Sequence, residues 1–325
     1  MTTRERFRAA MNFEPVDRLP AIEWAPWWDK TVDRWYAEGL ASHLAANAIR
    51  EYFGLDLHHW IWLGPPCDRP HPERPHGDGL LESLDEYDRQ AALLHGPVQL
   101  DYDMLARAAV DQRRGTHFVW LQIDGFFWFP RNVLGIERHL YAFYDHPDLM
   151  HRINRDLCDY NIRLIHALCE VLTPDSCSIA EDMSYNHGPM LSKAMFDEFL
   201  APYYRRLVPV MLEHGILTTV DSDGLITPMI PWLEEVGVQG SNPLERQAGV
   251  DVARIRRDHP AWRMVGGFDK TVMHRGEAAI RAEFERLLPV MRSGGYLPSC
   301  DHQTPPEVSL EDYPGVSPKR ESLLS

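Results

Sequence analysis

Two acidic residues one position apart follow a short segment of apolar and β-branched residues, Ile216–Val220. Such a segment is typical of a buried parallel strand, and Asp221, Ser222, Asp223 and Gly224 come directly after it. Because alternate residues of a strand point to the same side, the two carboxylates are expected to face one spot. Converging carboxylates repel each other unless a cation, a shared proton or a hydrogen-bond donor lies between them. The pair is therefore a candidate reaction centre.

A purely structural interpretation of this pair also exists. Aspartate is common at helix starts, where its carboxylate accepts hydrogen bonds from the first backbone amides and complements the helix dipole. One of the two could cap the following helix while the other pairs with an arginine.

Short apolar segments of this kind alternate with helical patterns along the whole chain. Eight are predicted as strands: Leu19–Trp24, a strand within Leu55–Leu63, Phe118–Ile123, Cys177–Ala180, Ile216–Val220, Gly237–Ser241, Trp262–Gly267 and Tyr296–Pro298. The longest helical patterns are Ile136–Leu172 with a break at His146-Pro147, Lys193–Glu213 with Ser192 as N-cap, and Glu277–Arg292. Eight alternating units favour a single-domain α/β fold, a (β/α)8 TIM barrel. A doubly wound open sheet is the rival, which the lack of a Gly-x-Gly-x-x-Gly motif after a first strand weakens.

Nearly every predicted strand ends in a polar or ionisable residue. In a barrel these residues meet at the carboxyl-terminal mouth, where barrel enzymes carry their active sites. Glu181 and Asp182 end the fourth strand, and at most one should reach the pocket because neighbouring strand residues face opposite sides. Cys300 and His302 follow the eighth strand, where a thiol and an imidazole could bind a metal or handle a proton. Packing for the cysteine and a loop hydrogen bond for the histidine are the alternatives.

Further residues at or after strand ends are candidates for binding a substrate. They are Trp24, Trp28, Trp60, Asp124, Asn242, Glu245 and Lys270. The tryptophans predict an aromatic-walled pocket for a flat, apolar substrate, with core packing as the alternative. Lys270 follows Asp269 and could form an ion pair or clamp an anionic group.

Charge and composition limit the classes of partner. Asp and Glu number 48 against 33 Lys and Arg, a net charge of −15 that argues against nucleic acid and polyanions. No apolar run approaches the roughly 20 residues of a membrane helix, and the N-terminus lacks a signal-peptide core. The 5 scattered cysteines argue against a disulfide framework. We expect a cytoplasmic protein with a small-molecule substrate. The sequence does not decide between a monomer and a homodimer.

Several stretches, in order along nearly the whole chain, resemble the uroporphyrinogen decarboxylase superfamily. They are Glu5-Arg6-Phe7, Asn12–Pro20, Ser192–Phe196 with Pro202-Tyr203-Tyr204, Gly266–Lys270 and Gly294–Pro306. The resemblance implies a (β/α)8 barrel with its site at the carboxyl-terminal mouth. It also implies one of two activities, either decarboxylation of uroporphyrinogen without a cofactor or zinc-dependent methyl transfer between a corrinoid protein and a thiol.

The sequence departs from both patterns of this superfamily. The decarboxylases carry an Arg-Gln-Ala-Gly-Arg loop whose arginines hold the substrate carboxylates, whereas residues Glu23–Lys30 are acidic and rich in tryptophan. The methyltransferases carry His-x-Cys-Gly after the fifth strand, which corresponds here to Asp221–Gly224, and a cysteine that matches Cys300. The resemblance thus implies a divalent metal, with zinc the first choice, on Asp221, Asp223, Cys300 and His302.

These features together predict a metal-dependent methyltransferase for a small substrate such as a methoxylated aromatic or a thiol. Its catalytic residues would be Asp221, Asp223, His302 and Glu181. The chain lacks the Asp-x-His-x-x-Gly sequence that cobalamin-binding domains resemble, so a partner protein would carry the corrinoid. One alternative is a metal-free decarboxylase that uses aspartate and histidine for proton handling. The other is a binding protein or inactive relative with the same fold.

Overall fold

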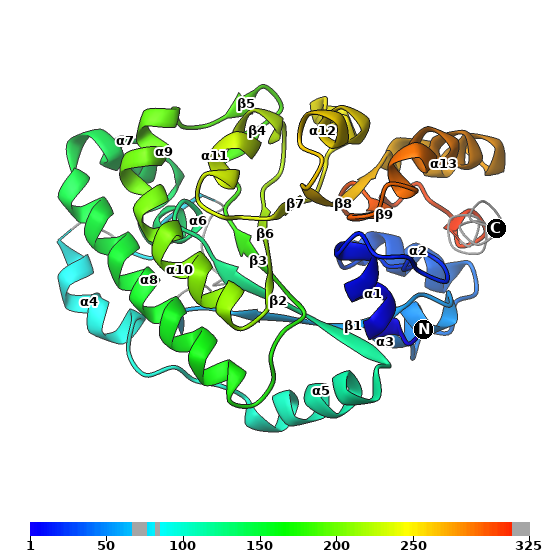
Figure 1. Cartoon of the computed structure of the whole chain (residues 1–325), viewed down its shortest axis with the longest axis horizontal. Helices are drawn as coiled ribbons and strands as arrows, with labels where there is room; N and C mark the ends of the chain where they lie inside the picture. The colour runs from blue at the N-terminus through cyan, green and yellow to red at the C-terminus, as the bar shows by residue number, and fades with distance from the viewer. Residues whose placement is uncertain (67–76, 82–84, 314–325) are drawn as a thin grey trace.

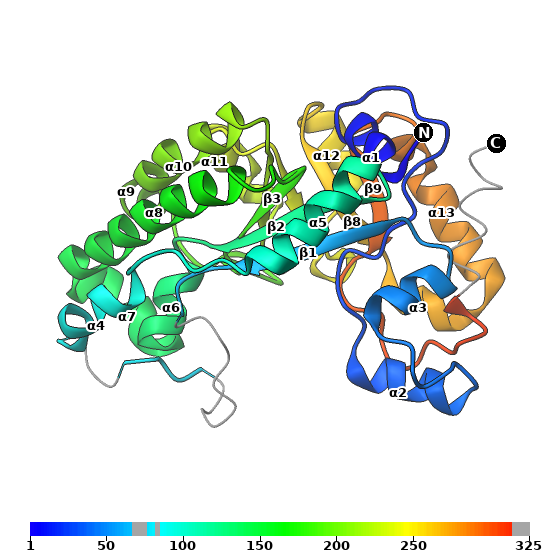
Figure 2. The same cartoon turned by 90° about the horizontal axis from the view of Figure 1, so that it is seen from below.

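The computed structural model describes residues 1–66, 77–81 and 85–313 of the chain. Its centre is a parallel sheet of seven strands in the order β1-β2-β3-β6-β7-β8-β9, which curls as in a barrel (Figures 1 and 2). These strands are β1 (Leu57–Leu63), β2 (His117–Asp124), β3 (Ser176–Ala180), β6 (Leu217–Asp221), β7 (Gly240–Asn242), β8 (Arg263–Phe268) and β9 (Tyr296–Cys300). The predicted barrel architecture and seven of its strands are confirmed.

The predicted first strand, Leu19–Trp24, is not a strand in the structure. The segment is buried and nevertheless lies between β1 and β9, where a first barrel strand belongs. Its Ala21 carbonyl accepts from the Asp56 amide at 2.8 Å, and Ser299 Oγ donates to the Ile22 carbonyl at 3.1 Å. Pro20 within the segment has no N–H to contribute to a ladder. A few backbone and side-chain hydrogen bonds therefore take the place of a continuous ladder at this position.

Helices surround the sheet, and α8 and α10 pack side by side along one flank (Figure 1). The α-helices are α1 (Thr3–Met11), α2 (Asp29–Ala37), α3 (Ala46–Tyr52), α4 (Glu86–Leu94), α5 (Tyr102–Arg114), α6 (Trp128–Leu134), α7 (Ile136–Asp145), α8 (Pro147–Cys169), α9 (Lys193–Phe199), α10 (Ala201–Glu213), α11 (Ile230–Glu234), α12 (Val252–Asp258) and α13 (Glu277–Met291). Shorter elements are the hairpin β4 (Ser184–Tyr185) and β5 (Gly188–Pro189) and the 3-10 helices η2 (Thr227–Met229), η3 (Arg246–Ala248) and η4 (Lys270–Arg275). Within the described parts of the chain, no helix combines the length and apolar character that crossing a bilayer requires.

Local sequence signals explain where several helices begin and end. Ser192 accepts a hydrogen bond from the Met195 amide at 3.2 Å, which confirms the predicted N-cap of α9. The predicted helix Lys193–Glu213 is interrupted at Leu200, because Pro202 cannot donate the next helical hydrogen bond. The predicted break at His146-Pro147 separates α7 from α8.

Helix α1 lies across the amino-terminal ends of the strands. Phe7 stacks on Phe118 at the start of β2, with ring centroids 3.9 Å apart, and the Ala10 carbonyl accepts from the Gly295 amide just before β9. Buried Asp56 binds the guanidinium groups of Arg6 and Arg18 at 3.0 and 2.7 Å. These contacts close the amino-terminal end of the barrel and leave the carboxyl-terminal end for a site.

The Ser299 hydroxyl should contribute measurably to the closure of the barrel between the segment Leu19–Trp24 and β9. Ser299→Ala removes its bonds to the Ile22 carbonyl and the Glu23 carboxylate, both of which are buried. We expect a loss of about 2 kcal/mol in the free energy of unfolding by urea. Ser293→Ala, on the exposed serine after α13, is the control and should cost less than half as much. Equal effects of the two substitutions would contradict this account of the closure.

Candidate active site

A cavity of about 230 Å³ lies at the carboxyl-terminal ends of the strands. Its lining combines four tryptophans, three aspartates and a histidine with a few small or polar residues. They are Trp24, Ala25, Pro26, Trp60, Trp62, Gln122, Trp128, Ala180, Asp182, Asp221, Asp223, His302 and Gln303. The barrel thus brings residues from both ends of the chain into one pocket, as the carboxyl-terminal mouth of a barrel is expected to do.

The aspartates of the Asp-x-Asp pair both face this pocket, and Asp182 joins them. Gln122 Nε2 donates to Asp221 Oδ2 at 2.7 Å. Burial raises the pKa of Asp221 well above its ordinary value, and the charges of Asp182 and Asp223 raise it further. Burial and the Asp223 carboxylate likewise raise the pKa of Asp182 to about 6. The three acids in this pocket therefore favour either a bound proton or a bound cation.

Asp182 reaches the pocket through an uncommon backbone conformation. Its φ of 43° lies in the left-handed region, which few residues other than glycine adopt. The turn after Asp223 depends on Gly224, whose φ is 83°. A Cβ at this position would lie 2.5 Å from Tyr185 Cα in the β4–β5 hairpin. The hairpin and the Asp-x-Asp turn therefore pack directly against each other.

His302 and Glu245 lie close to Asp223. His302 Nε2 lies 3.5 Å from Asp223 Oδ1, and this interaction raises the pKa of the imidazole. Glu245 Oε2 accepts from the Gly224 amide at 2.8 Å. One ligand atom from each of Asp223, Glu245 and His302 lies within 4.8 Å of the other two. Two carboxylate oxygens and an imidazole nitrogen are donors that zinc and other divalent metals accept.

Cys300 does not belong to this group, so the ligand set expected from the sequence needs correction. Its buried thiol faces Met273 in η4, with the two sulfur atoms 3.9 Å apart. Burial raises the pKa of the thiol well above its ordinary value, which disfavours the thiolate that binds metals. Glu245, expected as a substrate contact, belongs to the group instead, whereas Asp221, also expected as a ligand, does not.

The expected catalytic role of Glu181 also needs correction, because its side chain lies outside the pocket. The carboxylate accepts from the amides of Phe126 at 2.9 Å and Phe127 at 2.6 Å, and from the Tyr204 hydroxyl. A Cβ on Gly125 would lie 2.2 Å from Glu181 Cδ, so this glycine permits the approach. Burial raises the pKa of Glu181 to about 7 although these hydrogen bonds act in the opposite direction. Glu181 shapes the loop that leads into α6.

The expected substrate contacts divide into those that line the pocket and those that support it. Trp24 and Trp60 line it, whereas Trp28 is 41% exposed and lies outside the lining. Asp124 is a supporting residue, whose Oδ1 accepts from Trp62 Nε1 at 3.0 Å.

The remaining two expected contacts, Asn242 and Lys270, are not among the residues that line the pocket. Asn242 Oδ1 accepts from buried Ser178 Oγ at 2.8 Å inside the barrel. Lys270 Nζ lies 3.5 Å from Glu245 and 3.9 Å from Asp301, so its ion pair is with these acids and not with Asp269.

Gln122 is a pocket residue that was not predicted from the sequence. It stands alone as an amide within the apolar strand β2 and is 3% exposed. Its Oε1 accepts from Trp60 Nε1 at 3.0 Å while its Nε2 serves Asp221. A polar residue inside a strand predicted to be buried must find partners, and that requirement was the available signal.

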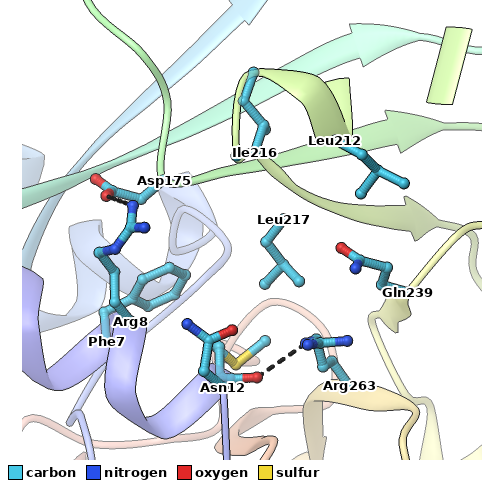
Figure 3. Close-up of a pocket in the computed structure, with 11 residues that line it drawn as sticks. Phe7, Arg8, Asn12, Asp175, Leu212, Ile216, Leu217, Gln239 and Arg263 are labelled. Atoms are coloured by element: carbon cyan, nitrogen blue, oxygen red, sulfur yellow. Dashed lines mark hydrogen bonds and ion pairs between the residues drawn. The ribbon is translucent and has the colours of Figure 1, made fainter. Parts of the chain in front are cut away.

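A second hollow of about 170 Å³ lies at the opposite end of the barrel, beside α1 and the start of β6 (Figure 3). Its two arginines are already committed. Arg8 pairs with Asp175 at 3.1 Å, and Arg263 Nε donates to the Met11 carbonyl at 2.9 Å. Because this end of a barrel serves stability, we assign the chemistry to the carboxyl-terminal pocket.

Comparison with known proteins agrees with this barrel. The chain matches the family model described as uroporphyrinogen decarboxylase (URO-D) over residues 131–314, more than half of its length. It is 27% identical over 178 residues to uroporphyrinogen decarboxylase of Pseudomonas aeruginosa, which covers 51% of this chain and 46% of the relative. The enzyme of Pseudomonas paraeruginosa is 28% identical over 167 residues, or 46% and 45% of the two chains. The chain therefore spans about half the length of these curated relatives.

A solved structure shares the fold over its full length. It is a methyltransferase from Methanosarcina mazei, with a TM-score of 0.70, 16% identity and 100% of both chains covered. At this identity the likeness establishes the fold alone.

Glu181→Gln should flatten the dependence of stability on pH. Between its unfolded pKa of 4.5 and its folded pKa of about 7, the folded protein keeps a proton that the unfolded chain has released. The wild-type protein therefore loses about 3 kcal/mol from this group as pH rises through that interval, and the variant does not. Urea unfolding measured across the interval tests this, with exposed Glu213→Gln on α10 as the control. Identical pH profiles for wild type and Glu181→Gln would contradict it.

Proposed function

The chain belongs to the uroporphyrinogen decarboxylase family, and on that basis we propose that it is a metal-dependent methyltransferase. It would move a methyl group between a small substrate in the carboxyl-terminal pocket and a corrinoid carried by a partner protein. The observation that carries this proposal is the group formed by Asp223, Glu245 and His302 at the edge of that pocket.

The charge of the pocket argues against uroporphyrinogen as the substrate. That molecule carries eight carboxylates, which require fixed cations such as bidentate guanidinium groups. Among the described residues that line the pocket there is no lysine or arginine, and three are aspartates. The nearby cations are engaged, since Arg131 lies 3.8 Å from Asp182 and Lys270 pairs with Glu245 and Asp301. An octa-anion would be repelled here.

The donor set fits a divalent metal. Asp223, Glu245 and His302 offer two oxygens and one nitrogen, and three protein ligands with an open position are typical of catalytic zinc. When bound, such a metal would supply Lewis acidity that lowers the pKa of a thiol or alcohol group. The solved methyltransferase with this fold shows that such a barrel can carry out methyl transfer.

The chain's own residues have separate parts in this proposal. Asp221 Oδ2 is engaged by Gln122, which leaves Oδ1 to accept or return a proton of the substrate. Trp24, Trp60 and Trp62 line the pocket and would pack against the substrate. Gln122 fixes the indole of Trp60 and the carboxylate of Asp221 relative to each other.

Metal analysis tests the proposed ligand group directly. Protein purified without chelator should contain about one divalent metal per chain. Removing even an outer-shell partner weakens metal binding 10- to 100-fold, so Asp223→Asn or His302→Ala should weaken it by at least about tenfold. Asp182→Asn is the matched control, because it removes a carboxylate from the same pocket but not from the ligand group. A metal content that neither ligand substitution lowers would refute this assignment.

Turnover separates methyl transfer from the decarboxylase alternative. With reduced cobalamin as the methyl acceptor, Asp221→Asn should lower the rate of methyl transfer by about a hundredfold. Release of carbon dioxide from a carboxylic acid by metal-free protein, without methyl transfer, would instead favour the decarboxylase. Asp269→Asn, in the turn before η4, serves as the control for the loss of a carboxylate outside the pocket.

A further inference from the structure

Two of the tryptophans that line the pocket are partly exposed. Trp60 and Trp62 lie two residues apart in β1 and are 36% and 41% exposed. Both line the pocket at the carboxyl-terminal mouth of the barrel. Their ring centroids are 5.9 Å apart, and Trp128 lies 6.4 Å from Trp62. Trp24 also lines the pocket and lies beside His302, with ring centroids 6.3 Å apart. Four indoles therefore surround one small cavity.

The polar edges of three of these indoles are already used. Trp24 Nε1 donates to the Cys300 carbonyl at 2.9 Å. Trp60 and Trp62 donate at 3.0 Å to Gln122 and Asp124. These N–H groups are not free to bind a ligand, so the rings offer it their π faces. The negative face of an indole attracts a cation, and tryptophan is the side chain that does so most strongly.

The carboxylates in the same pocket add attraction of the same sign. Asp182, Asp221 and Asp223 all line it, and no lysine or arginine occurs among its described lining residues. The protein as a whole carries a net charge of −15, which also favours the approach of a cation. A neutral aromatic substrate would use the tryptophans but leave this negative charge without a partner.

We propose that the pocket binds a methylated ammonium cation as its methylated substrate. Quaternary and tertiary ammonium groups have few or no N–H donors, so they interact through their methyl surfaces with π faces and through their charge with carboxylates. This pocket supplies both. The inference narrows the substrate class of the proposed methyltransferase, and it rests on that proposal for the fate of the methyl group. Binding of the cation does not depend on that proposal.

A matched pair of probes isolates the effect of charge. Choline and 3,3-dimethyl-1-butanol have nearly the same shape, and only choline carries a positive charge. Isothermal titration of metal-free protein should show choline binding at least about tenfold more tightly than the neutral alcohol. Equal affinity for the two would overturn the proposal. Tighter binding of methoxybenzene, a neutral methoxylated aromatic, than of choline would also overturn it.

Tryptophan variants show whether the binding occurs in this pocket. Trp60→Leu and Trp62→Leu should each weaken choline binding at least about fivefold. Trp28→Leu is the control, because this indole is as exposed as Trp62 but lies outside the lining. Asp182→Asn should weaken choline and leave the neutral alcohol unchanged. Circular dichroism confirms folding, and unaltered choline binding in both pocket variants would refute the assignment.

The design keeps this proposal separate from the proposed function. The titration needs neither metal nor methyl acceptor, so a lack of metal or of turnover leaves its result unaffected. Conversely, metal binding and methyl transfer from an uncharged donor, together with no preference for choline, would overturn the substrate class and retain the methyltransferase.

Discussion

Negative charge gathered in one partly buried pocket is the constraint on which the rest of this structure depends. Asp182, Asp221 and Asp223 line the same cavity, where burial and then their mutual repulsion raise the pKa values of the first two. The chain counters this repulsion in part. The Gln122 amide bonds Asp221, and the imidazole of His302 lies 3.5 Å from Asp223. A cation or a proton from outside the chain completes the balance, and both proposals above follow from this need.

The two ends of the barrel divide stability from chemistry. At the amino-terminal end, buried Asp175 accepts hydrogen bonds from Arg4, Gln112 and the Val119 amide, which ties α1 and α5 to the sheet. At the carboxyl-terminal end, polar groups instead point into an open cavity. Gln122 connects the aromatic and the acidic parts of that cavity, because its amide group hydrogen-bonds both the Trp60 indole and the Asp221 carboxylate. A rigid strand therefore places an aromatic surface and an acid in a fixed relation.

The family relationship and the pocket carry different information. Matching the uroporphyrinogen decarboxylase family over residues 131–314 accounts for the barrel and for the position of the site. It does not account for a pocket of tryptophans and aspartates, which has the opposite charge preference from a site for a polycarboxylate. A barrel keeps its stability at one end while the residues after its strands vary at the other, so one fold supports different substrates.

The sequence by itself determined seven of the parallel strands, the helix break at Pro147, and the approach of Asp221, Asp223 and His302 to one mouth. Each of these follows from residues close together in the chain, because strand period, proline and strand-end position act locally. Only the tertiary structure decided which side chains complete the site. Glu245 in place of Cys300, and Asp182 in place of Glu181, depend on which face each residue takes after its strand. The partners that set those faces, such as Met273 for the thiol and the amides of 126–128 for the carboxylate, lie far away in the sequence.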